Sequence, residues 1–249
     1  MAEPLLKARG LTKTFGAIRA TDGLSLDVWT GEVLAVIGPN GAGKTTAVGQ
    51  LSGELKSDAG TIHFEGRDIS GFPMHKRAHL GLARSFQITS IFLMFTAEDN
   101  VAMALQAQDG HSFRFWKAAR NDQKLRNPAR EMLEEVGLAD RADVAAANLS
   151  HGEQRQLELA MALATRPSML LLDEPMAGMG LEDSSRMVDF LLKLKGRVTI
   201  LLVEHDMDAV FALADRITVL VYGKVVATGT PEKIRTDPTV QKAYLGEDI

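Results

Sequence analysis

Short hydrophobic runs of strand length recur along the chain. Four of them are each bounded by polar or turn residues: Val33–Ile37, Met169–Leu172, Val198–Val203 and Ile217–Tyr222. Helical patterns lie between several of these runs, and this order is typical of a parallel sheet that is covered by helices. The sequence therefore predicts an α/β fold with a buried parallel sheet.

The beginning of the chain follows a different pattern. Hydrophobic and polar residues alternate over Leu5–Phe15 and Leu24–Trp29, with interruptions at Gly16 and Gly23. A further short strand is predicted over Gly60–Glu65. Alternation of this kind indicates strands with one face buried, so we expect an antiparallel sheet beside the core.

From residue 87 to about residue 166 the strand signal gives way to helical patterns. The predicted helices are Ala97–Gln106, Phe113–Leu125, Pro128–Val136 and Glu153–Thr165. We therefore expect residues 1–249 to form one domain. Its α/β core and antiparallel sheet take residues 1–86 and 167–249, and a helical subdomain, residues 87–166, is inserted between them.

Composition narrows the class of protein. The chain has 249 residues, 45% of them hydrophobic and 24% charged, which is ordinary for a soluble globular domain. Its net charge of −4 gives no general reason to expect nucleic-acid binding. The absence of cysteine excludes disulfides and thiolate metal sites and suits a reducing cytoplasm. We find neither a signal-peptide pattern nor an apolar run of bilayer length, so we expect a chain that does not itself cross a membrane.

The first chemically specific motif directly follows the first buried run. Residues 38–45 are Gly-Pro-Asn-Gly-Ala-Gly-Lys-Thr, a phosphate-binding loop (P-loop) between a predicted strand and a predicted helix. Its glycines let backbone N–H groups converge on phosphate oxygens, and the helix N-terminus adds a favourable dipole. Lys44 is placed to reach the β- and γ-phosphates and Thr45 to bind Mg²⁺. A glycine-rich turn that binds nothing is the alternative, which the complete match disfavours. The predicted nucleotide-binding residues here are Gly38, Pro39, Asn40, Gly41, Ala42, Gly43, Lys44, Thr45 and Thr46.

The hydrophobic run Met169–Leu172 ends in two carboxylates, Asp173 and Glu174. Open α/β sheets bind their ligands at the carboxyl ends of the strands. We expect Asp173 to hold Mg²⁺, usually through water, and Glu174 to be the general base for the attacking water. A strand that merely runs into a solvated acidic turn is the alternative, and the P-loop in the same chain disfavours it.

Residues 149–154, Leu-Ser-His-Gly-Glu-Gln, complete the pattern. Together with the P-loop, the Asp173-Glu174 strand and His205, they resemble the ATP-binding subunits of ABC transporters, whose signature is Leu-Ser-Gly-Gly-Gln. The resemblance covers essentially the whole chain. It implies the ABC ATPase variant of the P-loop NTPase fold, in which a head-to-tail dimer sandwiches two ATP molecules. In such a dimer Ser150 and Gly152 of one subunit contact the γ-phosphate held by the other.

The same resemblance assigns four further residues. Phe15 matches the aromatic residue that stacks on adenine, with a core aromatic as the alternative. Gln87 matches the loop glutamine that senses Mg²⁺ and the γ-phosphate and links to the membrane subunits. His205 matches the histidine that contacts the γ-phosphate, with a structural histidine as the alternative. Glu153 of the signature joins the predicted ATP-binding residues.

Two residues depart from the family pattern. His151 occupies a position that is usually glycine in the signature, and we expect it to be tolerated because it need not touch phosphate. Gly180 takes the place of an aspartate that normally bridges the two ATP sites of the dimer. Communication between the two sites is therefore expected to be weaker or differently connected.

The insert at residues 106–127 and the ending, residues 227–247, resemble one subgroup, the larger ATPase subunit of branched-chain amino acid importers. Residues 91–101 resemble the socket for a permease coupling helix, although their apolar side chains could equally be buried core. The insert at residues 106–127 has a basic, aromatic-bearing face, which is either a solvated helix or a contact with anionic headgroups or permease loops. The residues of the basic face are Phe113, Arg114, Phe115, Trp116, Lys117, Arg120, Lys124 and Arg126.

The resemblance implies an ATPase with ATP and Mg²⁺ as cofactors that drives import of branched-chain amino acids or a related solute. The implied partners are a second ATPase subunit in a homo- or heterodimer, two transmembrane permeases and, indirectly, an external solute-binding protein, with no nucleic acid. The implied location is the cytoplasmic face of the inner (cell) membrane. Alternatives are the ATPase of a lipid exporter, a non-transport ABC ATPase, and a partner that uses ATP only as a clamp.

Overall fold

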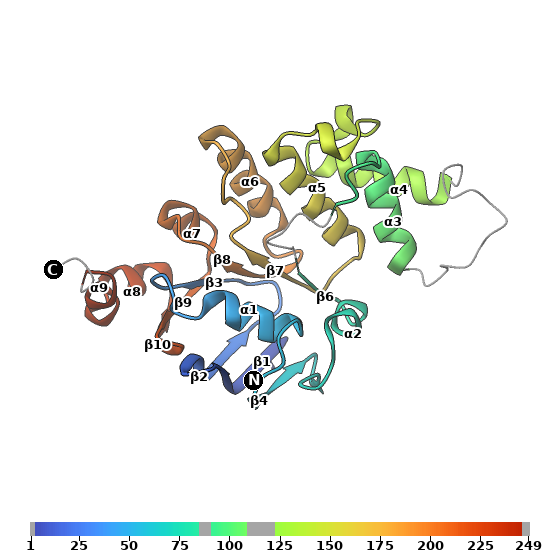
Figure 1. Ribbon diagram of the computed structural model, residues 1–249. Coiled ribbons are helices and arrows are strands. Elements are labelled where there is room, and N and C mark those ends of the chain that lie inside the picture. The colour runs from blue at the N-terminus through green and yellow to red at the C-terminus, as the bar shows by residue number, and fades with distance from the viewer. Residues whose placement is uncertain (1–2, 85–90, 109–122, 246–249) are drawn as a thin grey trace.

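Two β-sheets with a helix between them form the centre of the molecule (Figure 1). The computed structural model describes residues 3–84, 91–108 and 123–245. The smaller sheet has the order β2-β1-β4-β5 and is antiparallel throughout. Its strands are β1 (Leu6–Phe15), β2 (Ile18–Val28), β4 (Ala59–Phe64) and β5 (Arg67–Asp68).

The larger sheet has the order β10-β9-β3-β8-β7-β6. Its strands run parallel except for β10, which pairs antiparallel with β9 at the edge. Because β3, β8 and β7 are parallel neighbours, their carboxyl ends meet at one edge of the sheet, where ligands of such sheets bind. The strands are β3 (Val33–Ile37), β6 (Leu82–Arg84), β7 (Met169–Asp173), β8 (Thr199–Val203), β9 (Arg216–Val221) and β10 (Lys224–Gly229).

Helices cover both faces of the larger sheet and also lie beyond its two edge strands. Figure 1 shows α1 between the two sheets, α6 and α7 over the opposite face of the larger sheet, and α3, α4 and α5 gathered beyond β6. No helix in the described ranges is long and apolar enough to cross a membrane. The helices are α1 (Lys44–Ser52), α2 (Met74–His79), α3 (Ala97–Gln108), α4 (Gln123–Glu135), α5 (His151–Ala164), α6 (Leu181–Leu194), α7 (Met207–Leu213), α8 (Pro231–Thr236) and α9 (Pro238–Leu245).

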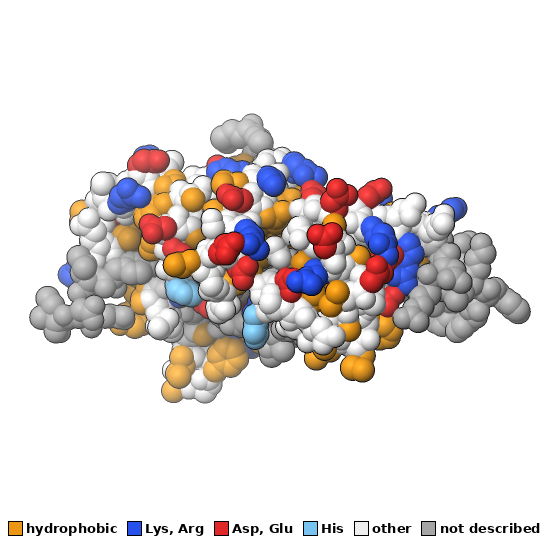
Figure 2. Space-filling view, turned by 90° about the horizontal axis from the view of Figure 1, so that it is seen from above, with side chains coloured by type: hydrophobic (Ala, Val, Ile, Leu, Met, Phe, Trp, Pro, Cys, Tyr) orange, Lys and Arg blue, Asp and Glu red, His pale blue; other side chains and the backbone are white. Residues whose placement is uncertain are grey.

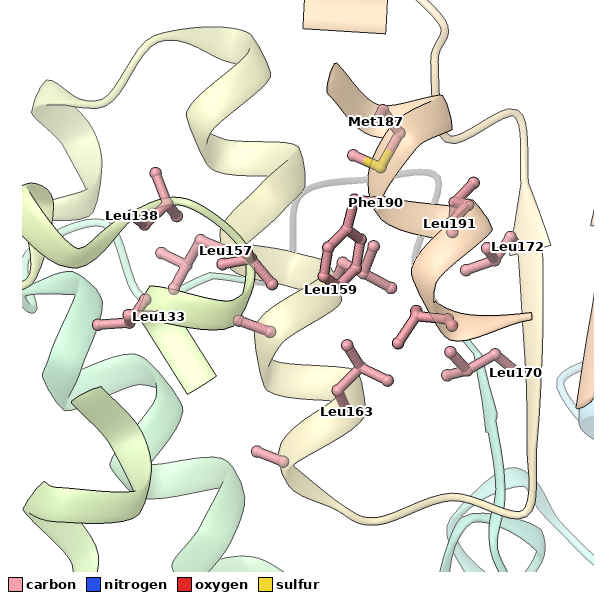
Figure 3. Packing of buried hydrophobic residues seen from close by; sticks show 14 of the residues in the cluster. Leu133, Leu138, Leu157, Leu159, Leu163, Leu170, Leu172, Met187, Phe190 and Leu191 are labelled. Carbon is pink, nitrogen blue, oxygen red and sulfur yellow. The ribbon is translucent and has the colours of Figure 1, made fainter. Parts of the chain in front are cut away.

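The side chains of β7 alternate between two hydrophobic cores. Met169 and Leu171 belong to the core that the smaller sheet and α1 share with the larger sheet. Leu170 and Leu172 face the other core, where they meet helices α5 and α6, with Phe190 of α6 among their neighbours (Figure 3). Burial of each such side chain stabilises the fold by about 1.5–3 kcal/mol. The strand that leads to Asp173 is therefore held from both faces.

The structure confirms the expected α/β fold with an antiparallel sheet and a helical region, but several boundaries differ. Gly23 was predicted to interrupt a strand, yet it lies inside β2 with a φ of 70°. A glycine with positive φ produces a bulge without ending the strand, and the β1–β2 register shifts beside it. The sequence patterns also missed β6, which has three residues, and the edge strand β10.

The start of α4 was placed wrongly, because the predicted helix began at Pro128 and the observed one begins at Gln123. Proline inside a helix removes one backbone hydrogen bond. Here the turn before Pro128 is held by Arg126, whose guanidinium pairs with Glu98 and Asp99 of α3. A second helix was predicted over residues 113–125. Its residues 113–122 lie outside the described residues, and so do most residues of the basic face.

Candidate functional site

The P-loop connects β3 to α1 at the carboxyl edge of the larger sheet. Two of its glycines are required by close backbone contacts. A Cβ atom at Gly38 would lie 2.1 Å from the carbonyl oxygen of Leu220, and one at Gly43 would lie 2.1 Å from that of Ala20. Because a side chain at either position would collide with a main chain, glycine is needed for the loop to pack there. The two glycines thus let the loop lie directly against the main chains of β9 and β2.

Lys44 is the first residue of α1 and is mostly buried. Its ammonium donates hydrogen bonds to the carbonyl oxygens of Gly38, at 2.6 Å, and Pro39, at 3.1 Å. Burial lowers the pKa of Lys44, while the nearby carboxylates of Glu174 and Asp173 act in the opposite direction. The structure therefore brings the predicted phosphate-binding lysine close to the two predicted carboxylates. Thr45 and Thr46 follow it in the same helix.

Asp173 ends β7 and is only 2% exposed. Its Oδ2 accepts a hydrogen bond of 3.1 Å from Arg84, whereas its Oδ1 has no partner among the described residues. Burial raises the pKa of Asp173, Arg84 opposes that rise and Glu174 adds to it. An unpartnered carboxylate oxygen beside a P-loop suits Mg²⁺, which binds one or two carboxylates together with water and phosphate oxygens.

Arg84 is a part of this site that the sequence patterns did not identify. It ends β6, and its guanidinium pairs with both Asp173 and Glu54. Because β6 is parallel to β7, Arg84 and Asp173 arrive at the same sheet edge. An arginine that ends an unrecognised three-residue strand offers no local signal, so this contact could not be read from sequence.

Glu174 and His205 follow neighbouring strands. Glu174 has a φ of 50°, and its backbone N–H donates to the carbonyl oxygen of Val203 at 2.9 Å. His205 follows β8 with its side chain 68% exposed. The structure therefore places Lys44, Asp173, Glu174 and His205 at the ends of three adjacent parallel strands. This arrangement offers an ammonium group, two carboxylates and an imidazole around one edge.

Ser150 is the N-cap of α5 and forms a capping box with Glu153. The Ser150 hydroxyl accepts from the Glu153 N–H at 3.2 Å, and the Glu153 carboxylate accepts from the Ser150 N–H at 2.8 Å. Arg141 donates to the same carboxylate at 2.8 Å. Partial burial acts to raise the pKa of Glu153, but the hydrogen bonds with Ser150 and Arg141 outweigh it, so the pKa is lowered. In the described part of the chain, Ser150 and Glu153 have no hydrogen bond to the P-loop of their own subunit.

Gly152 lies where α5 approaches α6. A Cβ atom at this position would be 2.7 Å from Oδ2 of Asp183 and 2.9 Å from its Cγ. Glycine thus permits the close contact between the signature helix and the first turn of α6. This packing role is independent of any contact with a nucleotide.

We expect Gly152→Ala to lower the free energy of unfolding by about 1 kcal/mol, the low end of the cost of overpacking, because the partly exposed Asp183 side chain can turn aside. Without a clash, alanine inside a helix would instead stabilise by about 1 kcal/mol. Urea unfolding of Gly152→Ala, alone and combined with Asp183→Ala, measures this difference. Restoration of stability by Asp183→Ala supports the steric explanation, and an equal loss in both backgrounds contradicts it.

The remaining predicted residues are distributed around this centre. Phe15 ends β1 with 47% of its surface exposed, and the Lys13 ammonium lies 5.6 Å from its ring centroid. His151 is exposed at the start of α5. Gly180 is the N-cap of α6, where no side chain caps the helix and a Cβ atom would meet nothing within 4 Å. Gln87 lies outside the described residues.

Comparisons with known proteins agree with this geometry. Residues 21–177 match the family model described as ABC transporter, and residues 224–249 match the one described as Branched-chain amino acid ATP-binding cassette transporter. The chain is 40% identical to the high-affinity branched-chain amino acid transport ATP-binding protein BraF of Pseudomonas aeruginosa, over 99% of this chain and 100% of that protein. It is 39% identical to LivG of Salmonella typhimurium, with the same coverage of each chain.

Solved structures give the same result. A nucleotide-free ATP-binding cassette from an ABC transporter superposes with a TM-score of 0.85 at 30% identity, covering 96% of this chain and 98% of that one. A cassette in its ADP conformation also gives 0.85, at 29% identity, with coverage of 98% and 100%. Fold, site and similarity define an ATP-binding cassette, and this chain is an ABC-type ATPase. Within the ABC transporters it belongs to the family of branched-chain amino acid transport ATP-binding proteins.

Proposed function

We propose that this ATPase powers the import of branched-chain amino acids or a closely related solute. The observation that carries the proposal is the convergence of Lys44, Asp173, Glu174 and His205 at one sheet edge in a chain that resembles BraF along its whole length. The C-terminal residues 224–249, which match the branched-chain amino acid family, favour this solute class over others.

The P-loop and Lys44 bind the phosphates of ATP in this proposal, and Phe15 stacks on the adenine through its exposed face. Thr45 and Asp173 hold Mg²⁺, which when bound neutralises charge on the β- and γ-phosphates. Glu174 orients the attacking water and accepts its proton. His205, exposed at the end of the neighbouring strand, contacts the γ-phosphate. Gln87 is proposed to sense the γ-phosphate and Mg²⁺.

The signature residues act on a second subunit. Ser150, Gly152 and Glu153 start α5, whose N-terminus is a suitable site for an anion. The hydrogen bonds of Ser150 and Glu153 remain within their own turn and reach Arg141. We therefore propose that they complete the ATP site of a partner ATPase in a head-to-tail dimer, identical to this chain or related to it.

The segment before α3 supplies a surface for the membrane subunits. Met94 is 89% exposed, and Phe92 and Phe95 are also exposed, with their rings packed edge to face at 5.9 Å between centroids. The buried Asn100 fixes this segment: its side chain accepts from the Phe92 N–H at 2.7 Å and donates to the Thr96 carbonyl at 2.9 Å. These contacts favour a preformed docking surface over buried core.

We accordingly propose a complex of two ATPases and two transmembrane permeases, fed by an external solute-binding protein. The ATPases lie at the cytoplasmic face of the inner membrane, with residues 1–86 and 167–249 as the catalytic core and 87–166 as the helical subdomain that contacts the permeases. A lipid exporter is the alternative, since the chain is also 34% identical to the lipopolysaccharide export protein LptB of Haemophilus influenzae. The match of residues 224–249 favours the importer.

Affinity capture from detergent-solubilised native membranes tests this proposal, with mass spectrometry of the captured proteins. We expect two multi-span permeases and a second ATPase to accompany the chain, and Met94→Asp to reduce the recovery of the permeases. Leu192→Asp, at an exposed apolar residue of α6, is the matched control and should leave recovery unchanged. ATP-dependent uptake of labelled leucine by vesicles that contain the complex then tests the solute. Capture of export permeases or ribosomal proteins would overturn the proposal.

A further inference from the structure

We infer that Glu204 is a positioning residue for ATP hydrolysis, holding the loop after β7 and the loop of His205 in one arrangement. The inference rests on the roles proposed above for Glu174 and His205. Glu204 directly follows β8 and is 1% exposed, so it is a carboxylate inside the protein at the edge where the site lies.

Each carboxylate oxygen of Glu204 accepts a hydrogen bond from a different loop. Oε1 accepts from the backbone N–H of Met176 at 3.0 Å, and Oε2 accepts from the backbone N–H of His205 at 3.2 Å. Met176 lies two residues after Glu174 and begins the segment that leads to Gly180. One side chain thus connects the main chain just after the proposed base, Glu174, to the main chain of His205, which carries the proposed imidazole.

Among the described residues, one other backbone hydrogen bond joins the chain after β7 to the end of β8 near the site, from the Glu174 N–H to the Val203 carbonyl oxygen. That bond continues the β7–β8 ladder, whose last pair is Asp173 with Val203. It fixes Glu174 but not the residues beyond it. Without Glu204, neither the Met176 N–H nor the His205 N–H retains an acceptor among the described residues.

Glu204 is enclosed, so we place it behind the site and not against a nucleotide. Its oxygen Oε2 is 3.9 Å from Nδ1 of His205, which is too long for a hydrogen bond. Glu204 is enclosed, whereas His205 is largely exposed. Burial raises the pKa of Glu204, with a further contribution from Glu174, and the two backbone donors oppose that rise. The two backbone N–H groups that donate to Glu204 explain why a carboxylate can be buried here.

The isosteric variant Glu204→Gln tests the inference most directly. An amide offers one acceptor oxygen, and its NH₂ group then faces the other backbone donor. We expect kcat for ATP to fall about 10-fold in Glu204→Gln and about 10²-fold in Glu204→Ala, the scale for small misplacements of catalytic groups. The KM for ATP should stay unchanged because the P-loop and Phe15 are not touched.

Glu32→Gln is the matched control. Glu32 is also a mostly buried carboxylate with a pKa raised by burial, and it accepts a backbone hydrogen bond from Trp29 at 2.7 Å. It precedes β3, however, at the opposite end of the sheet from the site. We expect Glu32→Gln to lose stability to urea while keeping kcat. An equal fall of kcat in both variants would overturn the inference.

A double-mutant cycle with His205→Ala separates positioning from general damage. If Glu204 acts through the loop of His205, Glu204→Gln should lower kcat less in the His205→Ala background than in the parent. If the fold-decrease of kcat in the double variant equals the product of the two single fold-decreases, the inference is contradicted. A KM that rises as kcat falls contradicts it as well. Glu174→Gln and His205→Ala are measured in the same full-length preparation. If these two leave kcat intact, the proposed site has failed, and not this inference alone.

Hydrogen exchange in the parent protein gives a second measurement that needs no variant. The amides of Met176 and His205 are expected to exchange more slowly than an exposed loop amide such as that of Gly178. Exchange of both at the rate of Gly178 would overturn the inference, even if Glu204→Gln failed to fold.

Discussion

Glu174→Gln is expected to lower the ATP turnover number by about 10²–10⁴-fold, the usual scale for loss of a general base. The amide keeps the size and shape of the side chain but cannot accept a proton. The backbone contact of Glu174 with Val203 is unaffected by the change, so ATP binding and subunit closure should survive. Steady-state phosphate release measures turnover, and equilibrium binding of a fluorescent ATP analogue measures affinity.

Glu135→Gln is a suitable control for this variant. Glu135 is a surface carboxylate at the end of α4 that pairs with Arg197, and its replacement should leave turnover unchanged. Turnover by Glu174→Gln equal to that of the parent would refute the assignment of Glu174 as the base. Loss of ATP binding in the same variant would point to a structural role instead.

Lys44→Ala is expected to weaken both ATP binding and turnover, because the same ammonium contacts phosphate in the ground state and in the transition state. We expect turnover to fall by about 10²–10³-fold, as for removal of one preorganised donor. The variant also leaves the carbonyl groups of Gly38 and Pro39 without the lysine that they now accept from. Titration with ATP and phosphate release at saturating ATP separate the two effects.

Lys195→Ala provides the matched control for Lys44→Ala. The Lys195 ammonium also donates to a main-chain carbonyl, that of Leu213 at 3.0 Å, and pairs with Asp215. It lies at the end of α6, outside the residues that we place in the ATP site. An unchanged affinity for ATP in Lys44→Ala would contradict the proposed role of the P-loop lysine.

The sequence predicted those parts of the fold whose signals are local. The buried runs of β3, β7 and β8 are strongly apolar, and the P-loop is recognisable residue by residue. The short strand β6 has too few residues for a periodicity. Strand β10 follows a tight turn in which Tyr222 and Gly223 have φ values of 47° and 77°, as in a type I′ turn. Tyrosine is not a residue that signals such a turn, so the hairpin had no clear sequence mark.

The contacts that the sequence did not reveal are all tertiary. Arg84 meets Asp173 only because β6 is placed beside β7. Asp183 meets Gly152 only because α6 packs against α5. Glu204 is the clearest example: in sequence it is one more acidic residue after a strand, and its burial depends on the loop from β7. Sequence motifs identify the residues predicted to contact ATP. The residues that hold them in place are set by packing between distant segments and have no motif.

The two-sided burial of β7 limits how the helical region can move. Leu159 and Leu163 of α5 share one core with Leu170 and Leu172 of β7 (Figure 3). Swinging α5 away would expose these side chains to water, at about 1.5–3 kcal/mol for each. Charged side chains of both signs are mixed over the face seen in Figure 2, so the surface there is already adapted to water. We therefore expect any rearrangement of α5 during an ATP cycle to be a small sliding of packed side chains over the sheet rather than the opening of a hinge.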